Sequence, residues 1–140
     1  MSKIAVVYWS GTGNTEEMAK SVLSGVSENG GEGSLIEACD FSAAMVDSFD
    51  AIAFGCPAMG EEELEETEFE PMFSAVSPAL TGKKISLFGS YEWGDGEWMR
   101  AWEDTCKKAG ASLVTDSVIC QLEPDDEALT ACRELGAALV

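Results

Sequence analysis

The sequence predicts an α/β protein built on an open, doubly wound sheet of five parallel strands with helices on both faces. Short apolar runs rich in β-branched or aromatic residues recur along the chain, and helical patterns separate them. A strand–helix order repeated about five times implies right-handed crossovers. We expect the 140 residues to form one domain, residues 1–140, which is large enough to bury a core.

Five runs are expected to form the strands. They are residues 3–9 (KIAVVYW), 50–55 (DAIAFG), 83–89 (KKISLFG), 112–120 (SLVTDSVIC) and, more weakly, 33–38 (GSLIEA). Gly, Ser or Asp bounds these runs, which are short, apolar and rich in β-branched or aromatic residues. That pattern is typical of strands buried on both faces of a parallel sheet.

Helices are expected between these runs, where apolar residues recur at three- and four-residue steps. The expected helices cover residues 14–28, 42–48 (a short one), 69–77, 97–109 and 125–139. A glycine pair at 30–31 ends the first of them. The sequence PDDE at 124–127 opens the last, because proline and acidic residues are favoured at a helix N-terminus.

The charge and the cysteines exclude several classes of function. A net charge of −18 argues against nucleic acid and against anionic membranes, and it favours solubility and basic protein partners. Histidine is absent, which excludes histidine-based catalysis and histidine metal ligands. The five cysteines form no C-x-x-C pair, so we expect reduced thiols and no metal site. No segment resembles a signal peptide or a membrane span, so we expect a cytoplasmic protein.

A phosphate-binding loop is predicted at residues 10–15, SGTGNT, between a strand and a helix. Gly11 and Gly13 permit positive φ angles that aim backbone amides inward, while hydroxyl and amide side chains add short-range donors. No Lys or Arg occurs between Lys3 and Lys20, and Glu16 stands where a dinucleotide fingerprint needs a third glycine. A terminal monophosphate fits this loop better than a pyrophosphate; the alternative is a plain strand-to-helix turn.

Two further loops, 56–63 and 90–97, are expected at the same edge, because the carboxyl ends of parallel strands meet there. Met59 and Trp93 lie in these Gly-flanked loops, an unusual place for an apolar side chain, although either residue alone is more often a core residue. Trp98 and Trp102 lie one helical turn apart, and we expect them to pack in the core.

Three stretches resemble the short-chain bacterial flavodoxins: YWSGTGNT (8–15), GCPAMGEEELEETEFEP (55–71) and LFGSYEWGDGEWM (87–99). The similarity runs in order over essentially the whole chain, including EPDDEALTACRELG (123–136). It implies a flavodoxin-like fold of strand order 2-1-3-4-5 and a non-covalent FMN. It also implies an electron-transfer protein, not an enzyme, that shuttles between semiquinone and hydroquinone at low potential.

The resemblance also implies roles for individual residues. The first loop would hold the FMN phosphate, Met59 and Trp93 would cover the isoalloxazine faces, the Gly60 carbonyl would meet flavin N5 on reduction, and Glu62 would accept from flavin N3–H. The full expected cofactor-binding set is Ser10, Gly11, Thr12, Gly13, Asn14, Thr15, Pro57, Ala58, Met59, Gly60, Glu61, Glu62, Ser90, Tyr91, Glu92, Trp93 and Gly94. Glu92 and Leu122 depart from the family's pattern.

The acidic run at 61–70, in which seven of ten residues are Glu, has two interpretations. It is a solvated approach to a helix, or it also steers the basic docking faces of redox partners toward the flavin edge. We expect a monomer that exchanges electrons with reductases and acceptor enzymes. The alternatives are a flavodoxin-like FMN enzyme such as an NAD(P)H:quinone reductase, and a non-redox phosphate-binding module.

Overall fold

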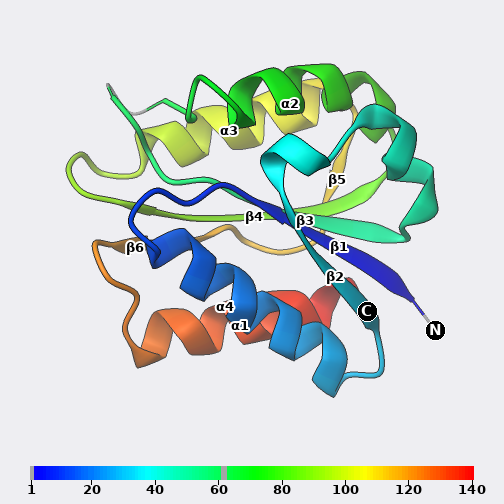
Figure 1. The fold of residues 1–140 in the computed structure, drawn as a ribbon, viewed down its shortest axis with the longest axis horizontal. Coiled ribbons are helices and arrows are strands. Elements are labelled where there is room, and N and C mark those ends of the chain that lie inside the picture. The colour runs from blue at the N-terminus through cyan, green and yellow to red at the C-terminus, as the bar shows by residue number, and fades with distance from the viewer. Residues whose placement is uncertain (1, 61–62) are drawn as a thin grey trace.

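A parallel sheet lies between two layers of helices in the computed structural model, which describes residues 2–60 and 63–140 (Figure 1). The strands are β1 (Lys3–Tyr8), β2 (Glu32–Glu37), β3 (Ala51–Gly55), β4 (Lys84–Tyr91), β5 (Ser112–Leu113) and β6 (Val118–Gln121). They pair in the order β2-β1-β3-β4-β5, and β6 also pairs with β4. The predicted parallel sheet and its strand order are confirmed.

The last predicted strand, 112–120, is divided into β5 and β6, which pair in turn with the two ends of β4. Between them the Thr115 hydroxyl donates to Ser86 Oγ at 2.9 Å and lies 3.0 Å from the Asp116 carbonyl oxygen. Ser117 donates to Glu103 Oε2 at 2.7 Å. Polar side chains that bond locally compete with the strand ladder, which explains the interruption.

In the described part of the chain, four α-helices and three 3₁₀ segments accompany the strands. The α-helices are α1 (Asn14–Glu28), α2 (Phe69–Val76), α3 (Glu97–Lys108) and α4 (Asp126–Leu139); the 3₁₀ segments are η1 (Ala38–Asp40), η2 (Ala43–Ser48) and η3 (Ser77–Leu80). The short helix expected at 42–48 is therefore a 3₁₀ segment. Figure 1 shows α1 and α4 on one face of the sheet and α2 and α3 on the other.

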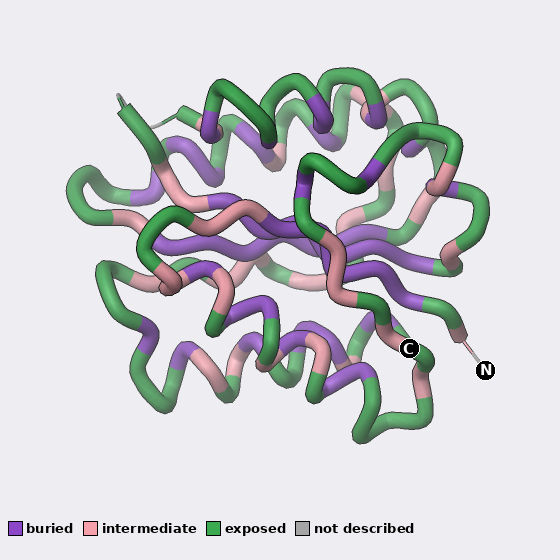
Figure 2. Tube along the Cα trace, viewed as in Figure 1, coloured by how far each residue is buried: buried purple, intermediate pink, exposed green. Residues whose placement is uncertain are grey.

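The core lies on both faces of the sheet, and Figure 2 shows the central strands as the most continuously buried part of the chain. Every residue of β3 is buried. Ile52 and Phe54 pack toward α2 and α3, whereas Ala51 and Ala53 pack toward α1 and α4. Because both faces are covered, these strands are apolar throughout, as their sequences predicted.

Trp98 and Trp102 pack in the core, as predicted from their spacing, and each is 2% exposed. The Trp102 ring meets Phe69 edge-on at 5.4 Å and Phe73 edge-on at 5.7 Å between centroids. These contacts join α3 to α2 above the sheet.

Helices α1 and α4 approach each other closely through two glycines that the sequence analysis did not single out. A Cβ atom on Gly25 would lie 1.9 Å from the Arg133 carbonyl oxygen, and a Cβ on Gly136 would lie 2.1 Å from the Val22 carbonyl oxygen. Both obstacles are backbone atoms, so a side-chain rotation cannot relieve the clash. The missing side chains therefore let the two helices cross in contact.

Gly136→Ala is expected to destabilise the protein by about 1–3 kcal/mol, because the added methyl group forces α1 and α4 apart. In an unhindered helix the same change stabilises by about 1 kcal/mol, so the sign of the effect tests the contact. Urea unfolding measures it, with Ser24→Ala on the exposed side of α1 as the control. A more stable Gly136→Ala protein would contradict the close crossing.

Candidate functional site

The loops that follow β1, β3 and β4 meet at one end of the sheet. They lie where the strand order reverses, between β1 and β3. Backbone hydrogen bonds tie these loops together: Trp9 N donates to Gly55 O at 3.0 Å, and Ala58 N donates to Ser90 O at 2.9 Å. They enclose a cavity of about 240 Å³. It is lined by Trp9, Gly11, Thr12, Asn14, Thr15, Pro57, Ala58, Met59, Gly60, Ser90, Tyr91, Glu92 and Trp93.

Most of the residues predicted for the site therefore surround one cavity. Ser10, Gly13 and Gly94 belong to the same loops but do not line it, and Glu61 and Glu62 lie outside the described residues. Trp9 lines the cavity and was not predicted. Its signal was its position, an aromatic residue directly between a buried strand and the polar loop.

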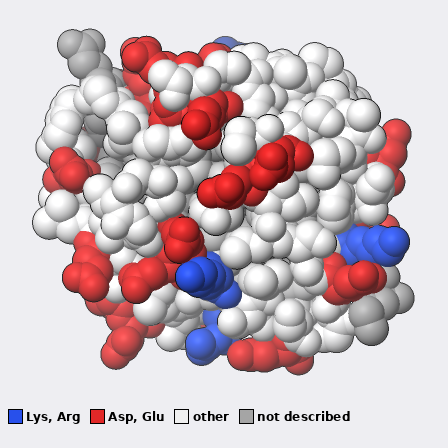
Figure 3. Space-filling model, in the orientation of Figure 1, with Lys and Arg blue, Asp and Glu red and all other residues white. Residues whose placement is uncertain are grey.

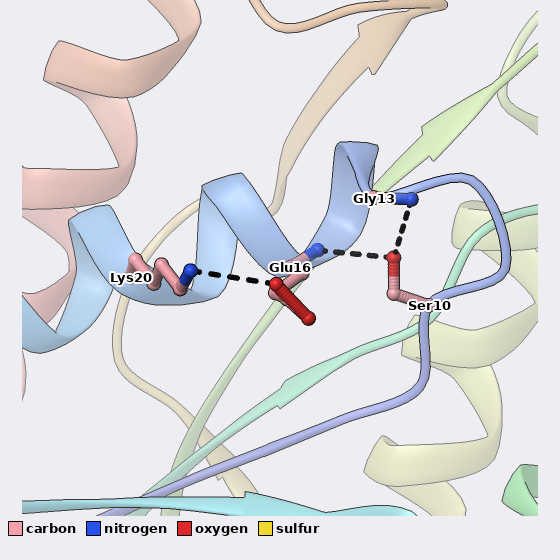
Figure 4. Close-up of polar contacts among 4 residues, drawn as sticks. All are labelled: Ser10, Gly13, Glu16 and Lys20. Atoms are coloured by element: carbon pink, nitrogen blue, oxygen red, sulfur yellow. Dashed lines mark hydrogen bonds and ion pairs between the residues drawn. The ribbon is translucent and has the colours of Figure 1, made fainter.

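The loop at 10–15 is organised by the Ser10 hydroxyl, which accepts from Gly13 N at 3.1 Å and from Glu16 N at 3.3 Å (Figure 4). Gly13 has φ +100°, as predicted, and it caps α1 without a side-chain hydrogen bond. Within residues 2–60 and 63–140, the amides of Thr12, Asn14 and Thr15 donate to no protein acceptor. A ring of donors is thus open to an anion at the N-terminus of a helix.

The prediction that Gly11 adopts a positive φ angle was wrong. Gly11 is not among the described residues with positive φ. A Cβ at this position would instead lie 3.0 Å from the Trp9 ring, tighter than an ordinary contact. Gly11 therefore makes room for the Trp9 ring, which packs across the loop.

No cation compensates the donor ring from within the loop. Lys20, the first basic residue after it, pairs with Glu16 at 3.4 Å along the exposed side of α1, as Figure 4 shows. Burial, and next the carboxylates of Glu16 and Glu37, raise the pKa of the Tyr8 hydroxyl nearby. The surroundings of the loop are therefore negative, and Figure 3 shows many carboxylates and few basic groups on the visible face.

A second part of the site is a tight hairpin that presents Met59. Met59 N donates to Glu63 O at 2.7 Å and Glu63 N donates to Met59 O at 2.9 Å, and Gly60 starts the turn with φ +57°. Met59 is 40% exposed and Trp93 is 57% exposed. Neither is a core residue, so the structure excludes the alternative in which both pack in the interior.

The loop after β4 is held from the neighbouring strand. Leu122 N donates to Tyr91 O at 2.7 Å, and the Gln121 side-chain amide donates to Glu92 O at 3.2 Å. Leu122 has φ +60°, the only positive value of a non-glycine residue in the described chain. Such strain persists only where the surroundings impose it. The two positions that depart from the family's pattern, Glu92 and Leu122, thus lie at one junction.

Thr15 and Ser90 form a buried pair in the wall of the cavity. Their hydroxyl oxygens lie 3.2 Å apart, and the two residues are 1% and 5% exposed. This hydrogen bond joins the first turn of α1 to the end of β4. It fixes the distance between the donor ring and the loop that carries Trp93.

Glu65 was missed by the sequence analysis, because it belongs to the acidic run and was taken as exposed. It is 4% exposed, and its carboxylate accepts from Thr67 N at 2.7 Å, Glu68 N at 2.7 Å and Phe69 N at 2.9 Å, and also from the Thr67 hydroxyl. Burial raises the pKa of Glu65, but these hydrogen bonds outweigh burial and lower the pKa. Glu65 therefore accepts the amides that precede α2 and that of its first residue, Phe69, and it anchors the segment that follows the hairpin.

The other glutamates of the acidic run differ from Glu65 in their exposure. Glu63, Glu66, Glu68 and Glu70 are exposed, as expected for a solvated approach to a helix. Glu65 N donates to the buried Cys56 sulfur at 3.4 Å, which ties the run to the end of β3. The run thus combines one structural carboxylate with a cluster of solvated ones.

These features are those of an α/β protein that binds a mononucleotide at the carboxyl edge of a parallel sheet. The Flavodoxin family model matches residues 6–136. A flavodoxin of Clostridium beijerinckii is 46% identical over 131 residues, covering 94% of each chain, and one of Megasphaera elsdenii is 44% identical, covering 96% of each. The solution structure of two-electron reduced Megasphaera elsdenii flavodoxin superposes with a TM-score of 0.90 over 97% of each chain.

The chain belongs to the flavodoxin family. It is an FMN-binding electron carrier and not an enzyme, and the alternative of an NAD(P)H:quinone reductase is not favoured. The open donor ring and the exposed Met59 and Trp93 fit the two ends of that cofactor, a phosphate and a planar ring. Within the part of the chain that the structure describes, no helix is both long and apolar enough to cross a membrane.

Glu65→Gln is expected to lower the free energy of unfolding by about 1.5–3 kcal/mol near neutral pH, because a charged acceptor of buried amides is lost. A lowered pKa contributes stability above the ordinary value of 4.5, and that contribution is lost as the pH falls through the folded-state pKa. The gap between wild type and variant should therefore narrow in acid. Urea unfolding from pH 7 downward, with exposed Glu66→Gln as control, measures it; a gap independent of pH would contradict this role.

Proposed function

We propose that the three loops around the 240 Å³ cavity hold FMN and that this chain is a low-potential one-electron carrier between redox enzymes. The observation that supports this most directly is the convergence of an uncharged anion-binding loop and two exposed ring-covering side chains on one cavity. When bound, the flavin supplies the one-electron chemistry. The remaining task of the protein is to bind it, orient it and set its potential.

The phosphate end rests on Ser10 and the open amides. The Ser10 oxygen accepts from two backbone amides, and its own O–H would donate to a phosphate oxygen. The amides of Thr12, Asn14 and Thr15 supply further donors at the N-terminus of α1, whose dipole favours a negative group. A dianionic phosphate would thus be held by dipoles alone.

The ring end rests on Met59 and Trp93, which present apolar surface on opposite loops. Stacking on an aromatic side chain is worth about 1–3 kcal/mol for a planar base, and a flavin ring offers a larger face. Gly60 and the predicted Glu62 would contact the flavin edge between them. The loops at Pro57–Ala58 and at Ser90–Gly94 would line the remaining edge.

The potential follows from the negative surroundings. Each unneutralised carboxylate at about 10 Å from the ring, at an effective dielectric constant near 40, opposes added negative charge by roughly 0.8 kcal/mol. For one electron this is on the order of 35 mV. Because the loop has no cation and Lys20 is paired with Glu16, these contributions add instead of cancelling.

Ser10→Ala is expected to weaken FMN binding about 10–100-fold, because a hydrogen bond to a charged group and the order of the loop are both lost. Riboflavin, which lacks the phosphate, should bind the variant as well as it binds the wild type. Titration of the apoprotein with each flavin, followed by flavin fluorescence, measures both. Exposed Ser74→Ala on α2 is the control.

The wild-type titration tests the proposed function itself. An apoprotein that takes up no FMN would overturn it. Equal weakening of FMN and riboflavin by Ser10→Ala would leave the family assignment intact but remove the phosphate from this loop.

Gly60→Ala is expected to shift the potential of the first one-electron step by about 40–80 mV to more negative values, with little change in the affinity for oxidised FMN. The Gly60 carbonyl would have to turn toward a bound flavin on reduction, and the two turn conformations differ in where φ is positive. A left-handed Ala costs about 1–2 kcal/mol. Gly82→Ala is the matched control, since Gly82 also has positive φ and open space around it but lies far from the site.

Spectroelectrochemical titration of both variants gives the potentials. A first-step potential unchanged by Gly60→Ala, or shifted as much by Gly82→Ala, would show that Gly60 has no part in setting it.

The partners are proposed to be reductases and acceptor enzymes with basic docking faces, met by this chain as a monomer. The exposed glutamates that follow the hairpin, together with the net charge of −18, support attraction to such faces. Electron-transfer rates should fall as ionic strength rises, and rates that do not depend on salt would contradict electrostatic docking.

A cytoplasmic location is supported by five unpaired cysteines, three of them buried, and cell fractionation tests it.

A further inference from the structure

The outer edge of β6 is an unpaired strand edge. Among the described residues, β6 pairs only with β4 and has no strand on its other side. Leu122 donates its amide to Tyr91 O of β4. Amides alternate in direction along a strand, so the amides and carbonyls of Ile119 and Gln121 point away from β4. These groups are available to another strand.

Apolar side chains gather at the same edge. Val114, Ile119 and Leu122 are 37%, 39% and 54% exposed. Apart from Met59 and Trp93 at the cofactor site, only the C-terminal Val140 is comparable among large apolar residues in the described chain. The opposite edge of the sheet, β2, exposes no large apolar side chain in the described residues.

A groove accompanies the edge. A cavity of about 790 Å³ runs along β6 against α4, and none of its lining residues belongs to the three cofactor loops. It is lined by five carboxylate residues and by no Lys or Arg: Asp116, Glu123, Asp125, Glu127 and Glu134. Arg133, the basic residue of α4, lies 3.7 Å from Glu28 of α1. A cationic occupant would therefore meet carboxylates in the groove and no positively charged side chain that repels it.

The sequence of β6 also lacks the residues that commonly protect exposed strands. Such edges normally carry Lys, Pro or a bulge that prevents pairing with other chains. The sequence of β6, VICQ, has none of these. A second copy of this chain would bring another net charge of −18 to the same groove, so self-pairing is opposed by charge.

From these observations we propose that β6 and the β6–α4 groove form a docking site for an extended basic segment of a partner protein, which adds to the sheet as a further strand. Main-chain bonds to Ile119 and Gln121 provide the pairing, and Lys or Arg side chains reach Glu127 and Glu134 on α4. The site is distinct from the cofactor cavity and does not depend on the flavin. It is nevertheless connected to it, because Gln121 donates to Glu92 O in the loop beside Trp93.

The test uses the FMN-loaded protein and a fluorescein-labelled seven-residue peptide that alternates Lys and Val. We expect saturable binding by fluorescence polarisation that weakens with salt. The same peptide, N-methylated at two consecutive central residues, keeps its charge but loses an amide donor on each edge. It should bind at least about tenfold more weakly, since strand addition requires those amides. Equal binding of the two peptides would show a purely ionic contact and overturn the proposal.

Charge-reversal variants locate the site. Glu127→Lys/Glu134→Lys should weaken the peptide about tenfold, whereas Glu32→Lys/Glu37→Lys, at the β2 edge, should leave its affinity within about twofold. Both double variants change the net charge equally, so a general effect of charge would weaken them alike and contradict the site. Retained FMN binding and circular dichroism confirm that each variant is folded.

Amide exchange gives a readout that charge alone does not move. On peptide binding, the amides of Ile119 and Gln121 should become protected, while those of β2 should not change. Protection at β2 instead, or sedimentation showing that the protein pairs with its own copy through β6, would assign the edge to a different occupant and refute the proposal.

Discussion

The register of β1, β3 and β4 is the constraint on which the rest of the site depends. Tyr8 and Gly55, the last residues of β1 and β3, lie opposite each other, and Gly55 lies opposite Phe88, beyond which β4 continues to Tyr91. A Cβ on Gly55 would lie 2.2 Å from the Phe88 ring, which fills the space that the glycine leaves at this junction. Because the three strands run parallel and are buried on both faces, the loops that follow them lie at the same edge, outside the sheet.

The electrostatics of the site follow from what this convergence omits. In the proposed site, backbone dipoles and hydroxyls would bind the phosphate without a cation, with Ser10 arranging the amides. The same unneutralised negative charge would make a bound flavin harder to reduce fully. Under this proposal, phosphate recognition and redox tuning are two consequences of one charge distribution.

The carboxylates are not interchangeable members of that distribution. Glu65 is buried and accepts from the first amide of α2, Glu16 pairs with Lys20 along α1, and Asp125 caps α4 by accepting from Ala128 N at 2.8 Å. Others are solvated near the hairpin or line the groove beside β6. The acidic residues therefore serve helix initiation at some places and, in the functions proposed here, cofactor tuning and partner recognition at others.

The sequence by itself determined the parallel sheet, the places of the main helices and the three loops. The spacing of apolar residues, the positions of glycines and the residue types in the loops are local properties that the sequence shows directly. Only the tertiary structure decided that Glu65 is buried, that Gly11 makes room for Trp9, and that Gly25 and Gly136 join α1 to α4. These depend on which distant backbone lies opposite a residue. The local sequence of a charge run or a lone glycine does not specify which distant residues contact it in the fold. Its role is therefore seen only in the tertiary structure.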